Sequence, residues 1–399
     1  MCLVVAALAV MAGACAGSSS GSDDAAPPPV ETLPPPLCQP APLDERAAAV
    51  LIVGLPGVVS SDDPQVVEAL DVGVGGIFVH RTNVKSAEQV AGLVADVRAG
   101  SRRPLVVSTD EESGRVSAFS VVVGRTPSAR RLAAERPLEE VREFARQTGA
   151  ALSRAGVDLD LAPVADLDDG PSGATIGDRS YSADPATASE NAYAFAAGLA
   201  DAGVRSAAKH FPGHGRAPGD SHLGRTSVTA SLQDLGTTDL VPFRDLVNAG
   251  IPVVMLSHVE YSALDPDLPA SLSPRAYQLL RSMGFRGVAV TDSVGMGAVG
   301  LRWGEAEATV MAVGAGADAV LSTDAGVARD MRDALVTAVQ EGRLSEGRLD
   351  EAAARMTALA GGDAMAMACQ SPDLPELAPP PGTAAGPTPA PPTSGRLGG

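Results

Sequence analysis

The 399-residue chain is short of positive charge and of aromatic side chains. Thirty lysine and arginine residues face 48 aspartate and glutamate residues, which gives a formal net charge of −18 at pH 7. This excess of negative charge argues against nucleic acid or an anionic membrane surface as the main partner, because both would repel the protein. Aromatic residues make up 3% of the chain, but hydrophobic residues reach 45%, which is sufficient for a large core.

Long apolar runs are also lacking. Near the N-terminus the run Leu3–Met11 is too short to span a bilayer as a helix of the mature protein. Small residues at 12–14 then precede Cys15, and this arrangement resembles a bacterial lipoprotein cleavage site. We therefore expect a signal peptide over 1–15, lipidation of Cys15 and location on the outer face of the cytoplasmic membrane, with secretion as the alternative.

Both ends of the chain are poor in large apolar residues. Residues 16–42 are rich in Ser, Pro, Asp and Ala, and residues 370–399 are rich in Pro, Ala, Gly and Thr. Such segments cannot bury enough apolar surface to offset the entropy lost on folding. We expect a disordered tether at 16–42, a disordered tail at 370–399 and one folded domain over 43–362.

Cysteine is scarce, with four residues in all. Cys2 and Cys15 belong to the expected signal segment, which leaves Cys38 just before the folded body and Cys369 just after it. In an oxidising compartment this pair is a candidate disulfide that would join the two ends of the domain. Neither of these two cysteines lies in a motif typical of a catalytic or metal site.

The body alternates between β-like apolar runs and helix-like segments. The expected strands are Val50–Val53, Gly76–Val79, Leu105–Ser108, Val157–Ala162, Val204–Ala208, Val253–Ser257, Val288–Thr291 and Ala319–Ser322. Their continuous apolar character is typical of strands covered on both faces. Eight such strands separated by helices predict a single (β/α)8 TIM-type barrel, with a doubly wound open sheet as the alternative. No GxGxxG or Walker loop follows the first strand, which argues against nucleotide binding.

Polar side chains gather where the expected strands end. The positions after the second to seventh strands hold His80 and Arg81, Asp110, Glu111 and Glu112, Asp166, Lys209 and His210, His258, and Asp292. All five histidines of the chain lie at or just beyond strand C-termini. Because the carboxyl ends of barrel strands meet at one face, this pattern predicts an active site there.

One stretch, Ala207 to His222, holds three of the five histidines. Its prolines and glycines predict an irregular loop that begins before Lys209 and carries the titratable groups. His210 and His214 have the spacing of a helical metal motif, but the Pro-Gly between them opposes a regular helix, so no metal is expected. Asp220 and His222 suit acid/base chemistry, because an aspartate two residues away can fix the tautomer of the histidine and raise its pKa. A structural role for these histidines is the remaining alternative.

Asp292 lies at the tip of an apolar strand. An aspartate there can be a nucleophile, a metal ligand or a helix N-cap. With Asp220 and His222 available as the acid/base pair, a nucleophilic Asp292 would complete a double-displacement glycosidase.

These residues resemble a known family. Lys209 to Gly215, followed after four residues by Asp220-Ser221-His222, is similar to the signature of glycoside hydrolase family 3, and more narrowly of its single-domain NagZ-type β-N-acetylhexosaminidases. Further stretches that agree with the family's motifs in order are residues 110–116, 161–166, 176–181, 255–259 and 291–296. The resemblance covers about Ala47 to Leu359.

The resemblance implies a reaction and a set of residues. It implies a retaining exo-β-N-acetylglucosaminidase that removes terminal N-acetylglucosamine from peptidoglycan fragments, acting as a monomer without metal or cofactor. Asp292 would be the nucleophile, His222 the acid/base and Asp220 its partner. The sugar would be held by the residues that match the family's binding positions, namely Asp110, Arg115, Arg179, Lys209, His210 and His214.

Three positions depart from the family pattern. Ala118 stands where a second sugar-binding arginine is usual, Ser113 where glycine is usual, and Ser293-Val294-Gly295 is an atypical sequel to the nucleophile. These departures bear on affinity and substrate range more than on the reaction. Two other functions stay open, a phosphorylase in which phosphate intercepts the glycosyl-enzyme and a weakly active glycan-binding lipoprotein.

Overall fold

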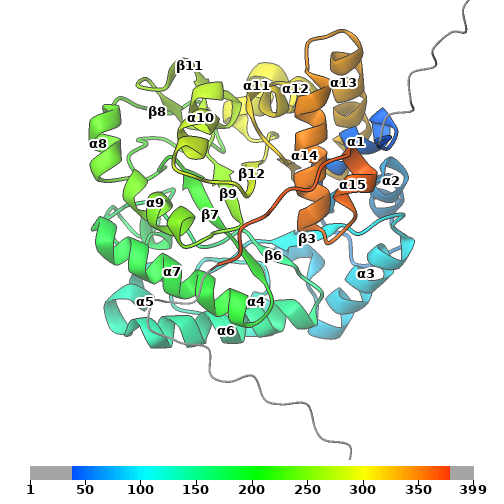
Figure 1. The fold of residues 1–399 in the computed structure, drawn as a ribbon. Coiled ribbons are helices and arrows are strands. Elements are labelled where there is room, and N and C mark those ends of the chain that lie inside the picture. The colour runs from blue at the N-terminus through cyan, green and yellow to red at the C-terminus, as the bar shows by residue number, and fades with distance from the viewer. Residues whose placement is uncertain (1–37, 378–399) are drawn as a thin grey trace, which may run out of the picture. The chain divides into compact units, whose positions relative to one another are not determined.

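The computed structural model describes residues 38–377, so residues 1–37, with Cys15, and residues 378–399 lie outside it. An eight-stranded parallel sheet at the centre is surrounded by helices (Figure 1). The barrel strands are β1 (Leu51–Gly54), β2 (Gly76–Val79), β3 (Val106–Thr109), β6 (Leu159–Asp160), β7 (Arg205–Phe211), β9 (Val253–Leu256), β12 (Val288–Thr291) and β13 (Val320–Ser322). Within 38–377 no helix is long and apolar enough to cross a membrane.

The strand order closes the sheet into a barrel. Neighbouring strands run β12-β9-β7-β6-β3-β2-β1-β13. A parallel bridge between Val290 and Ala319 joins the first and last of these strands. The (β/α)8 barrel predicted from the sequence is therefore confirmed, and the open doubly wound sheet is wrong.

Helices connect successive strands on the outside of the barrel. Those that follow the strands are α2 (Pro64–Val72), α3 (Ala87–Gly100), α6 (Leu138–Arg154), α7 (Pro185–Asp201), α9 (Leu240–Asn248), α10 (Pro274–Ser282), α12 (Glu305–Ala315), α13 (Ala328–Gln340) and α14 (Glu346–Leu359). Several begin at a side-chain cap, as at α3, where the hydroxyl of Ser86 accepts a hydrogen bond from the Gln89 amide. Right-handed strand–helix–strand units of this kind produce a barrel with parallel strands.

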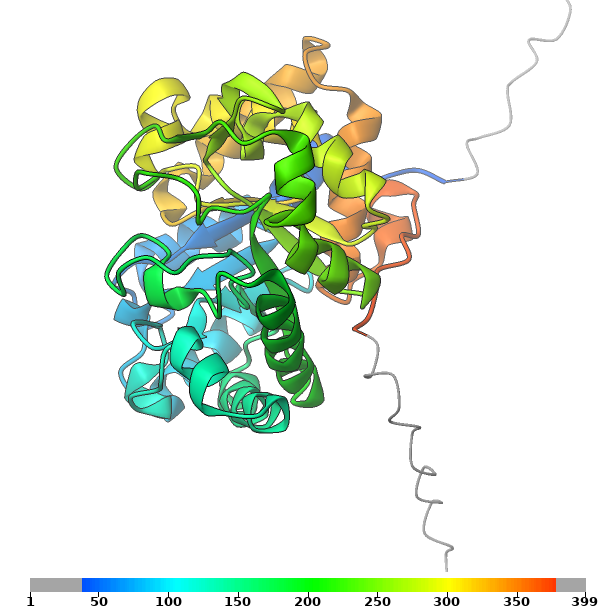
Figure 2. The ribbon, with the colours of Figure 1, turned by 90° about the vertical axis from the view of Figure 1, so that its left-hand side faces the viewer.

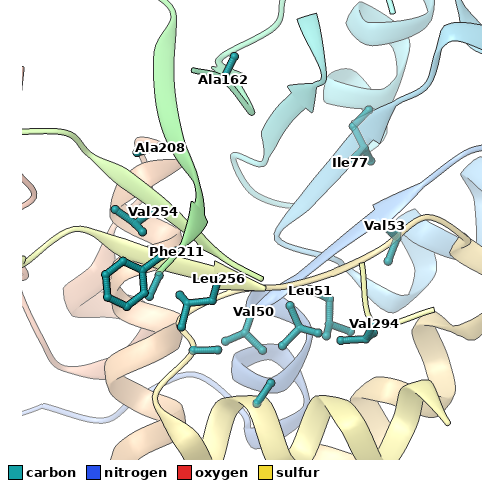
Figure 3. Packing of buried hydrophobic residues seen from close by; sticks show 14 of the residues in the cluster. Val50, Leu51, Val53, Ile77, Ala162, Ala208, Phe211, Val254, Leu256 and Val294 are labelled. Atoms are coloured by element: carbon teal, nitrogen blue, oxygen red, sulfur yellow. The ribbon is translucent and has the colours of Figure 1, made fainter. Parts of the chain in front are cut away.

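Two apolar cores result from the alternation of side chains along each strand. Ile52 of β1 points into the barrel, where side chains of the other strands and Met356 and Leu359 of α14 pack together. Leu51 and Val53 point outward and pack under the helices. Figure 3 shows part of this outer core, in which Phe211 of β7 lies beside Leu256 of β9.

β7 is longer than the sequence predicts. The predicted strand ended at Ala208, but β7 continues to Phe211, so Lys209 and His210 are strand residues and not loop residues. The register against β9 shifts between Ala208 and Phe211, and Lys209 instead bridges Val164. The extended strand thus carries both side chains into the barrel mouth on rigid backbone.

Short elements that the sequence pattern does not reveal are added to the barrel mouth. They are the hairpin β4 (Glu111–Ser113) and β5 (Val116–Ser117), the sheet of β8 (Ser227–Val228), β10 (Glu260–Tyr261) and β11 (Asp265–Pro269), and the helices α4 (Ser120–Val123), α5 (Ala129–Glu135), α8 (Leu232–Thr237) and α11 (Gly297–Trp303). These strands have two to five residues, which is too short for a periodic pattern.

The two ends of the described chain meet at the other end of the barrel. Cys38 and Cys369 form a disulfide with their Cα atoms 5.7 Å apart. It joins the segment before α1 (Leu43–Ala49) to the end of α15 (Ala364–Ala368). Figure 2 shows these orange to red C-terminal helices on the side of the barrel away from the green loop that follows β7.

The packed body extends past the predicted domain limits. The Ala41 amide, in the predicted tether, donates a hydrogen bond to the Met367 carbonyl. Leu374 and Leu377, in the predicted tail, pack on the barrel core and the outer core, respectively. The part of the predicted tail that is described therefore covers apolar surface.

Candidate active site

A cavity of about 410 Å³ opens at the carboxyl ends of the barrel strands. Its size lies in the range of small-molecule sites. The lining residues are Phe78, Val79, His80, Arg81, Asp110, Arg115, Val116, Ser117, Ala118, Arg179, Lys209, His210, His222, Met255, Asp292, Ser293, Met296, Leu321 and Thr323. Most of the predicted site residues are therefore brought together in one cavity.

Two buried cations and their carboxylates form the floor of the cavity. The Nζ atom of Lys209 lies 2.5 Å from Asp110 Oδ1 and 2.6 Å from Glu112 Oε1. Arg179 makes a two-pronged contact with Glu112, at 2.7 Å and 2.8 Å. Burial alone would lower the pKa of Lys209, but the Asp110 and Glu112 carboxylates raise it above its ordinary value. Lys209 and Arg179 have raised pKa values and Glu112 a lowered one, so these three groups are charged near neutral pH. Together with Asp110 they present fixed donors and acceptors to a ligand.

His210 is oriented by Asp166 and Arg179. Its Nδ1 atom lies 2.6 Å from Asp166 Oδ2, and its Nε2 atom lies 3.3 Å from the Arg179 guanidinium. Since a guanidinium can only donate, Nε2 accepts there and Nδ1 carries the proton. Burial would raise the pKa of Asp166, but His210 and the amide of His214 lower it, so the carboxylate stays ionised.

His222 lies at the exposed rim and is held by Asp220. Its Nδ1 atom is 2.7 Å from Asp220 Oδ1, and 58% of its side-chain surface is exposed. Burial alone would raise the pKa of Asp220. The hydrogen bonds from the His222 amide and ring outweigh burial, so the pKa of Asp220 lies below its ordinary value. An ionised Asp220 holds the Nδ1 proton of His222, which leaves Nε2 free for a proton at the cavity.

The loop that carries His222 is docked on the turn after β12. The amides of Gly297 and Ala298 donate to the carbonyls of His222 and Ser221. The Ser221 hydroxyl also lies 3.0 Å from Nε2 of His214. Glycine is required at 297 because a Cβ atom there would lie 2.7 Å from the Leu223 carbonyl oxygen.

Asp292 follows β12 directly, as predicted. Its Oδ1 accepts a hydrogen bond from the Ser293 amide at 2.8 Å. Burial would raise its pKa, but His258, His210 and that amide lower it below the ordinary value. The buried ring of His258 lies 2.8 Å from the Ser293 carbonyl and 2.6 Å from the Ser271 hydroxyl, which fixes the turn after Asp292. Asp292 is therefore an ionised carboxylate on rigid backbone.

Two predicted sugar-binding residues do different work in the structure. His214 is buried and absent from the cavity lining, because its ring packs against His210 and bonds to Ser221. Arg115 lines the cavity, but its guanidinium pairs with Asp178 and with carbonyls at 174–176. Ala118 also lines the cavity, so no arginine reaches the ligand from that position.

Sequence reasoning assigned no role to several residues that shape the site. Glu112 holds both cations of the floor and Asp166 holds His210, although their places after predicted strands were a usable signal. His80 and Arg81 line the cavity and carried the same signal. Met255 and Met296 also line it, but an apolar residue in a strand or loop gives no hint of such a role.

Glu111 and Asp160 form a buried carboxyl pair behind the floor. The Glu111 amide donates to Asp160 Oδ1, while Glu111 Oε2 accepts from the Ser117 hydroxyl and the Phe119 amide. Glu111 Oε1 and Asp160 Oδ2 have no hydrogen-bond partner among the described residues. Burial raises the pKa of Glu111 to about 7 and also raises that of Asp160. No group of three or more His, Cys, Asp or Glu within 38–377 is arranged to hold a metal ion.

Comparison with known proteins shows that the chain is similar to glycosidases. The family described as "Glycosyl hydrolase family 3 N terminal domain" matches residues 43–359. The chain is 39% identical to beta-hexosaminidase LpqI of Mycobacterium tuberculosis over 325 residues, 79% of this chain and 82% of the relative. It is 38% identical to a beta-hexosaminidase of Thiobacillus denitrificans over 257 residues, 62% of this chain and 71% of the relative.

Solved structures agree with the fold. The crystal structure of a family 3 glycosyl hydrolase from Mycobacterium smegmatis superposes with a TM-score of 0.75 at 39% identity, covering 80% of this chain and 97% of that one. A family 3 β-N-acetylglucosaminidase from Paenibacillus sp. superposes with a TM-score of 0.76 at 33% identity, covering 80% of this chain and 62% of that one.

Proposed function

Because the chain belongs to glycoside hydrolase family 3 and is an enzyme of the β-N-acetylhexosaminidase type, we propose that it removes terminal β-linked N-acetylglucosamine from peptidoglycan fragments with retention of configuration. The observation that carries this proposal is one cavity lined by an ionised carboxylate, Asp292, and by His222, which is backed by Asp220. A retaining glycosidase needs a nucleophile and an acid/base group at the same site.

In the first step an Asp292 oxygen attacks the anomeric carbon of the bound sugar. The bond from that carbon to the leaving oxygen breaks, and its electron pair stays on the oxygen. Protonated His222 gives its Nε2 proton to this oxygen, so the leaving group departs as an alcohol. Asp220 holds the Nδ1 proton of the ring, so the proton on Nε2 is the one that is given to the leaving oxygen.

In the second step water resolves the glycosyl ester on Asp292. Neutral His222, with its Nδ1 proton held by Asp220, accepts a proton from the water through Nε2. The water oxygen attacks the anomeric carbon, and the carboxylate of Asp292 is released. Two inversions give net retention.

The floor of the cavity suits a sugar in the subsite next to the nucleophile. Asp110, Lys209 and Arg179 offer charged acceptors and donors to hydroxyl and acetamido groups, and His210 helps to hold Arg179 in place through its Nε2 atom. Because these charges are already held by one another, they need no reorganisation when the sugar binds.

The proposed location at the membrane rests on the sequence of residues 1–15, which lie outside the described residues. Export through residues 1–15 and lipidation of Cys15 would anchor the enzyme on the outer face of the cytoplasmic membrane, where peptidoglycan lies. This location supports peptidoglycan fragments as the natural substrate.

The test is turnover of an aryl N-acetyl-β-glucosaminide and of a muropeptide, with and without phosphate. Asp292→Ala should lower kcat by several orders of magnitude because it removes the nucleophile. His222→Ala should lower kcat by about 10²–10⁴-fold on the muropeptide, whose sugar leaving group needs a proton, and by less on an activated aryl substrate.

The outcomes separate the candidate functions. Wild-type hydrolysis without phosphate, lost in Asp292→Ala, supports the proposal. Dependence on phosphate with release of a glycosyl phosphate would make the enzyme a phosphorylase, and no turnover of either substrate would leave a glycan-binding protein.

A further inference from the structure

Arg81 is a cation at the cavity that has no side-chain partner among the described residues. It lines the cavity from the 3₁₀ helix η1 (Arg81–Asn83), which follows β2, and its side chain is exposed. Within residues 38–377 its guanidinium makes no hydrogen bond or ion pair. Arg115, Arg179 and Lys209, the other arginines and lysine that line the cavity, each pair with a carboxylate.

The backbone that carries Arg81 is fixed by its neighbours. Buried Asn83 donates through its Nδ2 atom to the carbonyls of Leu55 and Val58, and its Oδ1 accepts from the His80 amide. Thr82 accepts a hydrogen bond from the Gly57 amide. Two of the three η1 side chains thus hold the turn in place, while Arg81 alone is left for a ligand.

His80 adds to this rigidity. Its Nε2 atom lies 3.1 Å from the Thr323 carbonyl, and its ring contacts Phe78 edge-on. The ring crosses over the end of β1, where a Cβ atom on Gly54 would lie 2.2 Å from His80 Nε2. Burial lowers the pKa of His80, so the ring beside Arg81 is neutral near pH 7 and adds no second charge.

The polar side chains of the cavity differ in how deeply they are buried. The floor cations are almost fully buried, with 3% of Lys209 and 10% of Arg179 exposed, and they face the terminal sugar under the proposed function. His222, which must meet the glycosidic oxygen, lies at the rim with 58% of its side chain exposed. Arg81 shares the exposure of His222 and not the burial of the floor cations, which favours the leaving-group side over the terminal-sugar side as its place along a bound substrate.

The two carboxylates that line the cavity, Asp110 and Asp292, interact with groups other than Arg81. Asp110 pairs with Lys209, and the carboxylate of Asp292 interacts electrostatically with His258, His210 and His222 and accepts a hydrogen bond from the Ser293 amide. Among the described residues Arg81 is thus left as a free cation at the cavity, and a guanidinium matches a carboxylate through two parallel hydrogen bonds.

We propose that Arg81 binds a carboxylate on the leaving-group side of the scissile bond and so selects substrates with an acidic aglycone. The inference rests on the proposed function. Two sources of this carboxylate exist in peptidoglycan fragments: the lactyl group of peptide-free muramic acid and the peptide of a muropeptide. Both present the same chemistry to Arg81.

The experiment compares substrates that differ in the carboxylate. They are N-acetylglucosaminyl-β-1,4-N-acetylmuramic acid, its lactyl methylamide, the same disaccharide carrying a peptide, and neutral chitobiose. Arg81→Gln should lower kcat/KM about tenfold or more on the substrate whose carboxylate Arg81 binds, chiefly through KM, because a charged hydrogen bond is lost. The methylamide and chitobiose should change less than twofold.

Two variants act as controls. Arg81→Lys keeps the charge and should restore part of the preference. Arg102→Gln removes an exposed arginine that precedes β3 at the opposite end of the barrel, so it changes the net charge equally and should change no substrate.

The pattern of loss decides the inference. A loss confined to the free lactyl substrate, or confined to the peptide substrate, supports the proposal and names the source. An equal loss on charged and neutral substrates, or no loss on any, would overturn it while the proposed function stands. Wild-type enzyme that cleaves none of the four would overturn both.

Discussion

Ser113 has a backbone conformation that residues with a side chain rarely adopt. Its φ angle is +77°, and the following Gly114 has φ +62°. The left-handed region costs a residue with a Cβ atom about 1–2 kcal/mol. The Ser113 hydroxyl is also buried without a hydrogen-bond partner among the described residues, which adds a desolvation cost. Both effects explain why glycine is usual here in the family pattern.

We therefore expect Ser113→Gly to raise the free energy of unfolding by about 1 kcal/mol, after the greater entropy of glycine in the unfolded chain is deducted. Urea denaturation measures this change. Gly114→Ala is the matched control and should destabilise, because its Cβ atom would lie 2.8 Å from Ser128 Cα at a positive φ. A destabilised Ser113→Gly variant would contradict the account.

The β4–β5 hairpin contains a second residue, Glu111, that lowers the free energy of unfolding at neutral pH. Glu111 is fully buried in it, and desolvation, with smaller contributions from Glu112 and Asp110, raises its pKa from 4.5 to about 7 despite two hydrogen bonds. The folded protein thus holds a proton that the unfolded chain releases above pH 4.5. The free energy of unfolding should fall by about 3 kcal/mol from this group as pH rises from 4.5 to 7.

Glu111→Gln should remove this dependence, because an amide stays neutral and its oxygen can still accept from Ser117 and Phe119. Urea denaturation at pH 5 and pH 8 should show the variant gaining stability relative to wild type at pH 8. Burial, the main cause of the raised pKa of Asp160, is present in both proteins, and the smaller contribution of Glu111 is lost in the variant. A difference between the two proteins that stays constant with pH would count against a buried, neutral Glu111.

Elements with a clear sequence pattern were predictable, and short ones were not. The strands Gly76–Val79 and Val288–Thr291 have the predicted bounds, because apolar β-branched runs end there at a polar residue. The length of β7 was not predictable, since its last residues are held by a register shift and a bridge to Val164. Hairpins of two or three residues gave no periodic signal.

The same limit applies to the site. Residues that follow strands, such as Asp292 and Lys209, were predictable because barrel topology gathers them. The burial of His214 and the pairing of Arg115 with the 174–178 segment depend on contacts between loops, which spacing in the chain does not encode. The sequence likewise gave no sign that, of the arginines and lysine that line the cavity, Arg81 is the one without a side-chain partner among the described residues.

For the whole molecule, the disulfide links residues 331 positions apart. Closing so long a loop restricts the unfolded chain, and such bonds typically contribute about 2–4 kcal/mol. Cys38→Ser with Cys369→Ser should therefore lower the free energy of unfolding by about that amount in urea denaturation. Activity on the aryl substrate should not change, because the bond lies at the end of the barrel opposite the cavity.

Reduced wild type is the control for this prediction. Dithiothreitol should lower wild-type stability to that of the double variant and leave the variant unchanged. Equal stability of oxidised wild type and variant would show that the bond adds nothing to the folded body.

The same bond makes the polypeptide from Cys38 to Cys369 a covalent ring. A protease that cuts a single exposed loop, such as the one near Gly170, would open this ring without releasing a fragment. Both pieces would stay attached through the disulfide and through the shared barrel. With its ends 5.7 Å apart between Cα atoms, the body is also suited to circular permutation, in which new termini are placed in a loop distant from the cavity.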